Sequence, residues 1–399
     1  MTRLPRSGDA AMVAPATEPS DIDPTDRRGR NRRRGGGRPL LTVLAALALM
    51  IGACGGSGED RGIEPDPTEV DGGAPGTTYP RPTLELVDEL LTERVDRDGL
   101  VGAALIVEPA DGAPHLHTVG AVGPATPVPL AETSFWLVAT VLLTLVDDGS
   151  VGLDEPVGAH LPWMTGTAST ITLRQLLSHT SGLPLAVECD DPTPAACDAA
   201  IGASPLVHPP GGALTVTALD AHVAARLAET VTGRPWDQLF RERLADPTTM
   251  TVTTFADPSS TGGLLATDGS TTADDLGRFL DVLRDDGRAG DVEILSAGSW
   301  REMLLDQTVR LDTHDEPWVA DTGVPTFGLG VWRDRLRGDD AAATVSAPNR
   351  YGLYPLVDTA RDAWAIVVID DRTLPRHDVV GASATLAQLT AAALRAPPN

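Results

Sequence analysis

Residues 171–184 read ITLRQLLSHTSGLP, and this stretch decides the fold. Its first half has the pattern of a short helix, because Thr172 and Gln175 stand at the spacing of a capping box, in which each side chain bonds the backbone N–H of the other residue. Gly182 and Pro184 then end the helix, since glycine suits a left-handed helix end and proline cannot continue it. The stretch predicts one short helix followed by a turn.

Apolar periodicity predicts further helices and strands on both sides of this stretch. Residues 135–148 are apolar nearly all round and end at Gly149, which predicts a buried helix. Other helices are expected at 83–96, 217–232, 236–244, 272–286 and 380–395, and strands at 100–108, 115–121, 327–336, 351–359 and 363–371. Early strands, a helical middle and late strands before a last helix predict one α+β domain, whose first and last segments share a sheet.

The stretch 171–184 also resembles the signature of the serine β-lactamase-related family, which includes class C β-lactamases, DD-peptidases and related esterases. The resemblance continues in order through LVDDGSVGLDEPVGAHLP (145–162), PPGG (209–212), ETVTGRPWDQLFRERLADPTTM (229–250), TTADDLGRFLDVL (271–283) and TFGLGVW (326–332). It covers about residues 83–395 and implies the fold of that family, a β-lactamase/transpeptidase-like antiparallel sheet flanked by helices, with an all-helical lobe and a cleft between the two.

The resemblance also implies three groups of catalytic residues. The first is Ser-x-x-Lys at the start of the buried helix, where the i, i+3 spacing puts both side chains on one helix face and lets the lysine take the serine proton. Here Ser134 is the hydroxyl residue of the right type, and Leu137 stands three residues later. All 31 basic residues of the chain are arginines, so no lysine can supply the partner from elsewhere.

The second group is Tyr-x-Asn, and the third is a His- or Lys-containing triplet on a strand. Counting between Pro210-Gly211 and Thr232-Gly233 places the second group at Val216 and Ala218, which cannot carry a proton or bond a substrate amide. Counting back from residue 358 places the third at Thr344-Val345-Ser346, and no histidine lies between His314 and His377. We therefore expect a degenerate member with no catalytic residues, whose altered cleft positions are Ser134, Val216, Ala218 and Ser346.

Two alternatives stay open at this stage. One is an active hydrolase with a non-standard set, in which Ser134 or Ser346 acts with Tyr351 or an acid. The other is a solute-binding lipoprotein that reuses the old cleft, which would keep a concave and partly apolar pocket. Ser178 and His179, and the pair Asp274 and Asp275, are interpreted as structural: the former follow the family segment, and the latter are acids favoured in a first helical turn.

The N-terminus has the features of an export signal. Residues 1–38 contain nine arginines, residues 39–53 are apolar, and the run ends in Ile51-Gly52-Ala53-Cys54. This ending resembles a bacterial lipobox, which implies that Cys54 is lipidated and becomes the first mature residue. The alternative is a short uncleaved membrane anchor. Residues 54–82 are rich in glycine, proline and acids and predict a flexible linker. We expect the domain at 83–399 to lie on the extracytoplasmic face of the cell membrane, held by lipid.

Composition narrows the choice of partners. The formal net charge of −25 argues against nucleic acid, since phosphate contacts need basic side chains. Besides Cys54 the chain has only Cys189 and Cys197, in the stretch 188–200, which has the pattern of a loop. Export to an oxidising compartment predicts a disulfide between them, with two free thiols as the alternative. No histidine or third cysteine stands at metal-ligand spacing from these two, and His115 and His117, which would share one strand face, are interpreted as solvated strand residues with metal binding as the alternative, so neither a metal nor a cofactor is expected. The expected partner is an unidentified ligand or protein of the cell envelope.

Overall fold

The computed structural model describes residues 82–308, 312–313, 326–334, 344–370 and 376–394. The chain divides into two units, residues 1–79 and 80–399, and the described residues all lie in the second. The predictions for Cys54 and for the segments 1–38 and 39–53 lie outside the described residues, as does nearly all of the segment 54–82. The described part contains no helix long and apolar enough to cross a membrane.

A seven-stranded sheet joins the first and last strands of the domain. Its order is β10-β11-β12-β13-β14-β1-β2, and every neighbouring pair is antiparallel. The strands are β1 (Gly102–Glu108), β2 (His115–Gly120), β10 (Thr326–Phe327), β11 (Trp332–Asp334), β12 (Thr344–Ser346), β13 (Leu353–Asp358) and β14 (Ala363–Asp370). The pairing of β1 with β14 confirms that early and late segments share one sheet.

The two faces of the sheet are covered by different helices. Helices α2 (Leu84–Asp98) and α11 (Arg376–Leu394) contact strands β1, β2, β13 and β14 from one side. The other face packs against α8 (Ala273–Arg284) and shares a buried apolar core with α3 (Ser134–Asp147). Since side chains alternate along a strand, the register decides which residues meet which helices.

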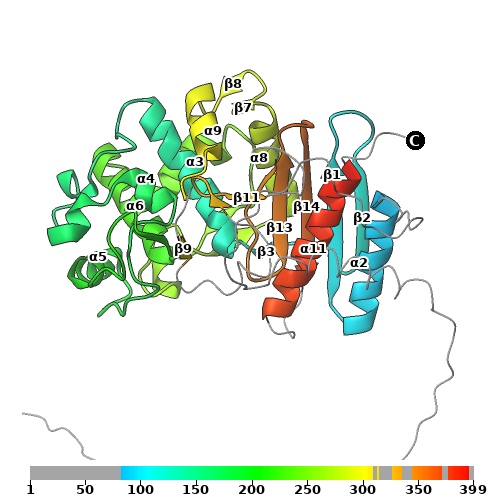
Figure 1. Cartoon of the computed structure of the whole chain (residues 1–399), viewed down its shortest axis with the longest axis horizontal. Coiled ribbons are helices and arrows are strands. Elements are labelled where there is room, and N and C mark those ends of the chain that lie inside the picture. Colours follow the sequence, from blue (N-terminus) through cyan, green and yellow to red (C-terminus); the bar gives the residue numbers. More distant parts are fainter. Residues whose placement is uncertain (1–81, 309–311, 314–325, 335–343, 371–375, 395–399) are drawn as a thin grey trace, which may run out of the picture. The chain divides into compact units, whose positions relative to one another are not determined.

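The remaining helices form a lobe at the opposite end of the domain from α2 and β2, as Figure 1 shows. This lobe contains α4 (Leu173–Leu177), α5 (Pro194–Ala203), α6 (Ala218–Thr232) and α7 (Trp236–Phe240), and α9 (Ala297–Leu304) packs near α3. Short strands complete the domain: β3 (Val128–Pro129), β4 (Ala213–Leu214), β5 (Thr254–Phe255), β6 (Gly269–Thr271), β7 (Arg288–Ala289), β8 (Val292–Glu293) and β9 (Asp312–Thr313). The expected α+β architecture with a helical lobe is confirmed.

Local patterns correctly predicted most of the helix ends. Thr172 and Gln175 form both bonds of the capping box at the start of α4. Helix α6 begins at Ala218 behind the N-cap Thr217 and ends at Gly233 in the left-handed region. The buried helix α3 has Trp136, Leu137 and the next eight residues buried, which is why its sequence is apolar all round.

Two predictions of secondary structure were wrong. The stretch 327–336 does not form one strand, because Gly328, Leu329 and Gly330 turn the chain between β10 and β11. Gly330 has φ of 74°, and a Cβ there would lie 2.6 Å from both the Phe135 carbonyl oxygen and the Ala139 Cβ atom, so the turn fits closely against α3. The stretch after Cys189 is not all loop either: Thr193 caps α5, and Pro194 occupies its first turn.

Candidate functional site

Ser134 begins the buried helix α3, as the family resemblance implies for a nucleophile. A 3-10 turn at Ala131–Thr133 leads into it, and the Thr133 hydroxyl donates to the Ala347 carbonyl oxygen (2.7 Å), which fixes the helix start beside the end of β12. The Ser134 side chain is 1% exposed, and its Oγ atom has no hydrogen-bond partner in the described residues. Leu137, at the lysine position, is fully buried in the core. Within the described residues Ser134 therefore has no base beside it, and its hydroxyl is buried.

Val216 and Ala218 lie at the junction between β4 and α6. Thr217 between them caps α6 and donates to the Pro184 carbonyl oxygen (2.9 Å), which holds the junction against the turn after α4. Ala218 is the first residue of α6. Val216 packs against an apolar cluster of Leu214, Phe327 and Trp332. The side chain at position 216 thus contributes packing and can carry no proton.

Ser346 ends β12, and its hydroxyl is engaged within the sheet. It donates to Asp334 Oδ1 (3.0 Å) and lies 3.4 Å from the hydroxyl of Tyr354, and Ser346 is fully buried. The neighbouring Val345 belongs to the core that includes α3, so alternation along the strand directs Ser346 to the opposite face of the sheet. Burial, together with the nearby carboxylate of Asp334, raises the pKa of Tyr354 well above its usual range. This serine therefore does not face the start of α3.

A row of aromatic rings connects the start of α3 with the β10–β11 turn. The imidazole of His179 meets the ring of Phe135 edge to face (centroids 4.5 Å apart) and the ring of Phe327 (5.2 Å), and Phe327 packs on Trp332 (4.7 Å). Val216 lies against the far end of this row. Among the described residues, the row therefore links the start of α3 to the apolar cluster beside the β4–α6 junction.

His179 is held in this row by a buried carboxylate. Its Nδ1 atom lies 2.7 Å from Asp220 Oδ2, and the two residues are 2% and 1% exposed. Burial raises the pKa of Asp220, against the hydrogen bond from His179, which lowers it. Neither His179 Nε2 nor Asp220 Oδ1 has a hydrogen-bond partner in the described residues. The partner of His179 lies 41 positions away on α6, so the local sequence indicates a structural histidine but carries no sign of its carboxylate.

Tyr351 lies in the turn between β12 and β13, close to the residues that lead into α3. The guanidinium of Arg350 lies over its ring (5.9 Å) and pairs with Glu132, just before α3. The Arg350 backbone N–H also donates to the Glu132 carboxylate (3.1 Å). These contacts bind the β12–β13 turn to the residues that lead into α3. The ring of Tyr351 thus packs against Arg350, which is itself paired with Glu132.

The acids Asp274 and Asp275 differ in their surroundings. Asp274 is exposed in the first turn of α8, whereas Asp275 is fully buried and accepts the backbone N–H groups of Thr251, Val252 and Thr253. Burial acts to raise the pKa of Asp275, but these hydrogen bonds outweigh it, so the pKa is lowered. The structural interpretation fits both residues, although the sequence did not reveal the tertiary role of Asp275.

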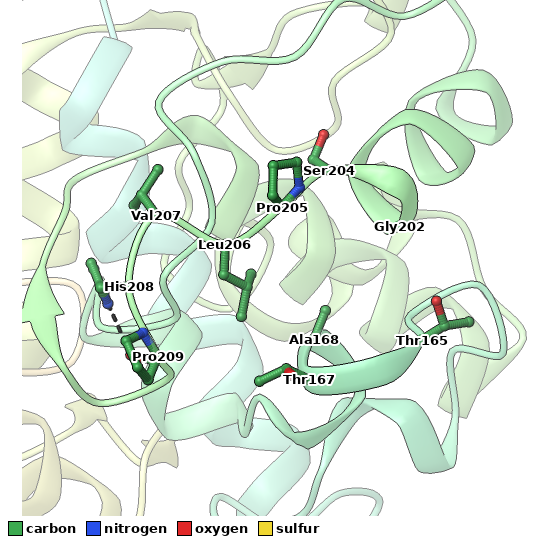
Figure 2. Close-up of a pocket in the computed structure, with 10 residues that line it drawn as sticks. All are labelled: Thr165, Thr167, Ala168, Gly202, Ser204, Pro205, Leu206, Val207, His208 and Pro209. Atoms are coloured by element: carbon green, nitrogen blue, oxygen red, sulfur yellow. Dashed lines mark hydrogen bonds between the residues drawn. The ribbon is translucent and has the colours of Figure 1, made fainter.

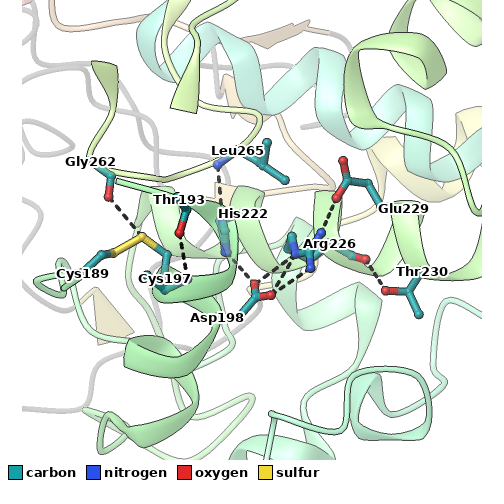
Figure 3. A network of polar contacts seen from close by, with 11 residues as sticks. Cys189, Thr193, Cys197, Asp198, His222, Arg226, Glu229, Thr230, Gly262 and Leu265 are labelled. Carbon is teal, nitrogen blue, oxygen red and sulfur yellow. Dashed lines mark hydrogen bonds and ion pairs between the residues drawn. A yellow bond between two sulfur atoms is a disulfide. The ribbon is translucent and has the colours of Figure 1, made fainter. Parts of the chain in front are cut away.

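Cys189 and Cys197 form the expected disulfide, next to a buried polar network (Figure 3). Asp198 follows Cys197 on α5 and accepts from Arg226 and from His222 Nε2 (3.0 Å), both on α6. The other nitrogen of His222 accepts the backbone N–H of Leu265 (3.0 Å), so its ring joins three segments of the chain. This arrangement anchors α5 to α6. In the described residues, no group of three or more histidine, cysteine or acidic side chains is placed to hold a metal.

A groove with a volume of about 490 Å³ lies on the helical lobe, at the end of α5. Figure 2 shows Leu206 and Ala168 at its centre, with Thr165 and Thr167 on one wall and Ser204 and His208 on the other side. The lining residues include no Asp, Glu or Arg. Both ring nitrogens of His208 are hydrogen-bonded. Nδ1 lies 2.9 Å from the Pro209 carbonyl oxygen, and Nε2 lies 3.1 Å from the Thr215 hydroxyl. The groove offers an apolar floor with a few hydroxyl groups.

Comparison with known proteins places this geometry in a family. Protein Rv1367c of Mycobacterium tuberculosis is 24% identical over 383 residues, covering 76% of this chain and 94% of the relative. Penicillin-binding protein 4 of Amycolatopsis lactamdurans is 31% identical over 178 residues, or 41% of this chain and 46% of that protein. A candidate β-lactamase from Bacteroides dorei has a solved structure with a TM-score of 0.69 and 25% identity, covering 78% of this chain and 98% of the other.

The family model named Beta-lactamase matches residues 87–389, which is most of the chain and nearly all of the domain from α2 to α11. The antiparallel sheet, the helical lobe and the buried helix α3 with a serine at its start agree with that match. This protein belongs to the β-lactamase family.

Proposed function

We propose that this protein is a membrane-tethered lipoprotein of the cell envelope whose β-lactamase-family domain is catalytically inactive and serves in binding, regulation or scaffolding. The observation that carries the proposal is the near-complete burial of Ser134 at the start of α3, next to the row formed by Phe135, His179 and Phe327. A nucleophile must reach its substrate within about 3 Å, and a buried hydroxyl gives a substrate no such position.

The missing bases support the same proposal. A serine near its ordinary pKa attacks poorly unless a positioned base takes its proton, and loss of proton transfer costs about 10²–10⁴-fold in rate. Leu137 and Val216 stand where the family resemblance implies lysine and tyrosine, and neither side chain can accept a proton. The chain has no lysine at all. The extracytoplasmic placement rests on the apolar run that ends at Cys54.

Labelling with a fluorescent penicillin tests the inactivity. We expect no covalent adduct by gel or intact mass above the level of Ser134→Ala, and the same rate of nitrophenyl acetate hydrolysis for both proteins. A serine substitution is the matched control, because it removes one hydroxyl and leaves the fold intact. Stoichiometric labelling of the unaltered protein that one serine substitution abolishes would overturn the proposal.

An active hydrolase with a non-standard set is the second candidate, and one specific observation favours it. His179 is paired with Asp220 as a catalytic histidine is paired with its carboxylate, and its Nε2 atom has no partner in the described residues. Ser134 Oγ likewise has none. The near-complete burial of all three residues weighs against it. Hydrolysis of nitrophenyl acetate distinguishes the two candidates. An active hydrolase requires a rate of hydrolysis above background that both Ser134→Ala and His179→Ala abolish.

The binding role in the first proposal includes binding of a solute. The groove on the helical lobe supports this, although it is not the old cleft between the lobe and the sheet. Its volume of about 490 Å³ falls in the range of small-molecule sites, and its walls are held by the α5–α6 network and by the His208 contacts. With no charged lining residue, it suits an uncharged solute. A thermal-shift screen of neutral solutes tests this, with Leu206→Arg as the variant that should lose any shift.

A further inference from the structure

Strand β2 is the end strand of the seven-stranded sheet. Within the described residues it has a single hydrogen-bonded neighbour, β1, with a continuous register from Gly102 and Gly120 to Val107 and His115. The outer row of its backbone N–H and C=O groups therefore has no strand beside it among the residues that the structure describes. An edge of this kind is a template for pairing with another extended chain.

The sequence of β2 carries none of the usual protections of an edge strand. His115–Gly120 reads HLHTVG, with no proline, no acid and no arginine, and its register shows no bulge. Exposure alternates along it, and Leu116 is 57% exposed beside the half-buried Ile106 of β1. The outward face of this edge thus carries one exposed apolar side chain, Leu116, beside Thr118 and Gly120, and Leu116 suits a neighbouring strand with apolar side chains.

The other face of the same edge is bordered by acids from α2. Asp88 bonds His115 (2.9 Å) and Thr92 bonds His117 (2.9 Å), which fixes the side of α2 that overlies β2. Glu85, Glu89 and Asp96 are exposed and form one stripe with Thr92, at the i, i+4, i+7 and i+11 positions of the helix.

The basic residues of α2 lie away from this border. Arg94 and Arg97 both pair with Asp98, and helical spacing places them on the opposite side of α2 from the stripe of Glu85, Glu89 and Asp96. The stripe therefore borders the open edge, and no ion pair of Glu85, Glu89 or Asp96 is seen within the described part of the chain. Figure 1 shows α2 and β2 together at one end of the domain, remote from the helical lobe.

We propose that the outer edge of β2 binds an extended, alternating basic and apolar segment of a partner protein as an eighth strand. Side chains alternate across a strand, so every second residue would point to the acids of α2 and the others would lie beside Leu116. A second copy of this chain is a poor occupant, because it would bring two acidic stripes together and each copy carries a net charge of −25. This inference does not depend on whether the domain is inactive as a hydrolase.

Peptide binding to the full chain in a non-ionic detergent tests the proposal. The probe is an acetylated and amidated eight-residue peptide that alternates arginine and valine, labelled with a neutral fluorophore. We expect saturable binding that weakens with salt, together with hydrogen-exchange protection of residues 115–120. A glutamate–valine peptide and an arginine–valine peptide methylated at every backbone nitrogen should both fail to bind. Equal binding of the methylated peptide would mean simple charge attraction and would overturn the proposal.

Two variants locate the site. Glu85→Gln/Glu89→Gln/Asp96→Asn should weaken binding about tenfold, since three exposed ion pairs are lost. The matched control removes three exposed acids near the β7–β8 hairpin, Asp285→Asn/Asp286→Asn/Asp291→Asn, and should change binding less than about twofold.

Leu116→Lys places an edge-protecting cation on β2 and should also abolish binding while leaving the melting temperature unchanged. Equal effects of the two triple variants on peptide binding would overturn the assignment, and so would hydrogen-exchange protection outside β2. Dimerisation of the unaltered protein that Leu116→Lys abolishes would also overturn it, because a second copy of the chain would then occupy the edge.

Discussion

The Nδ1 atom of His179 lies 2.7 Å from the Oδ2 atom of Asp220, and both side chains are buried. His179 adopts φ of 55°, in the left-handed region that few non-glycine residues occupy, so the local backbone is strained to present its ring to α6. The pair joins the turn after α4 to α6 and holds the His179 ring against Phe135 and Phe327.

Removing the carboxylate should destabilise the domain strongly. In Asp220→Ala the buried Nδ1 of His179 loses its partner, and breaking a buried pair costs about 3–5 kcal/mol. We expect a loss of about 3 kcal/mol in the free energy of unfolding, measured by urea denaturation. Asp190→Ala is the control, because Asp190 is exposed and its loss should change stability by less than about 0.5 kcal/mol. Equal effects would contradict a structural role for the pair.

The pH dependence of stability should differ in sign between two buried aspartates. Burial raises the pKa of Asp220, so the folded protein holds that proton more tightly than the unfolded chain. Its contribution is complete below pH of about 4 and is lost as the pH rises through the raised value. For Asp275 burial is outweighed by backbone hydrogen bonds and the pKa is lowered, so its contribution is present above pH of about 4 and is lost as the pH falls through the lowered value.

Asn variants measured across pH 2–8 should separate these two contributions. The stability of the unaltered protein relative to Asp220→Asn should decline as the pH rises above about 4, whereas its stability relative to Asp275→Asn should decline as the pH falls below about 4. Each variant serves as the control for the other. Parallel curves for the two variants would refute the assigned directions.

The disulfide should contribute a moderate and local stabilisation. Cys189 and Cys197 are eight positions apart, and closing so short a loop is worth about 2.5 kcal/mol in the chain-entropy account. Cys189→Ser/Cys197→Ser should lower the free energy of unfolding by about this amount and should speed hydrogen exchange in α5. Reduction of the unaltered protein should give the same result, and no change in either experiment would show that the α5–α6 network alone holds this region.

Cys54 should carry the lipid anchor. The apolar run at 39–53 ends in Ile51-Gly52-Ala53-Cys54, and an acyl chain contributes about 0.8 kcal/mol for each buried methylene. Cys54→Ser should leave a longer precursor or release the domain from membranes, as followed by intact mass and detergent partition. The Cys189→Ser/Cys197→Ser variant is the control and should keep its anchor. Unchanged mass and partition of Cys54→Ser would rule out lipidation.

Local sequence patterns determined the type of most elements and the fold class. The capping box at Thr172 and the helix end at Gly233 depend on bonds between residues three to six positions apart, so they are visible in the sequence itself. The apolar run of α3 required a helix buried on all sides. The assignment of Ser134 and Val216 to the cleft rests on counting between family segments along the chain and stays a prediction.

Tertiary structure alone decided what surrounds those positions. Asp220 reaches His179 across 41 residues, and Ser346 turns to Asp334 because the register of β12 sets its face. The hairpin at Gly330 forms because α3 packs against it, although the same residues taken alone have the pattern of a strand. The physical reason is common to all three: packing and pairing between distant segments outweigh local preferences of about 1 kcal/mol per residue. The sequence thus determined the fold, and long-range packing decided which side chains surround Ser134, Val216 and Ser346.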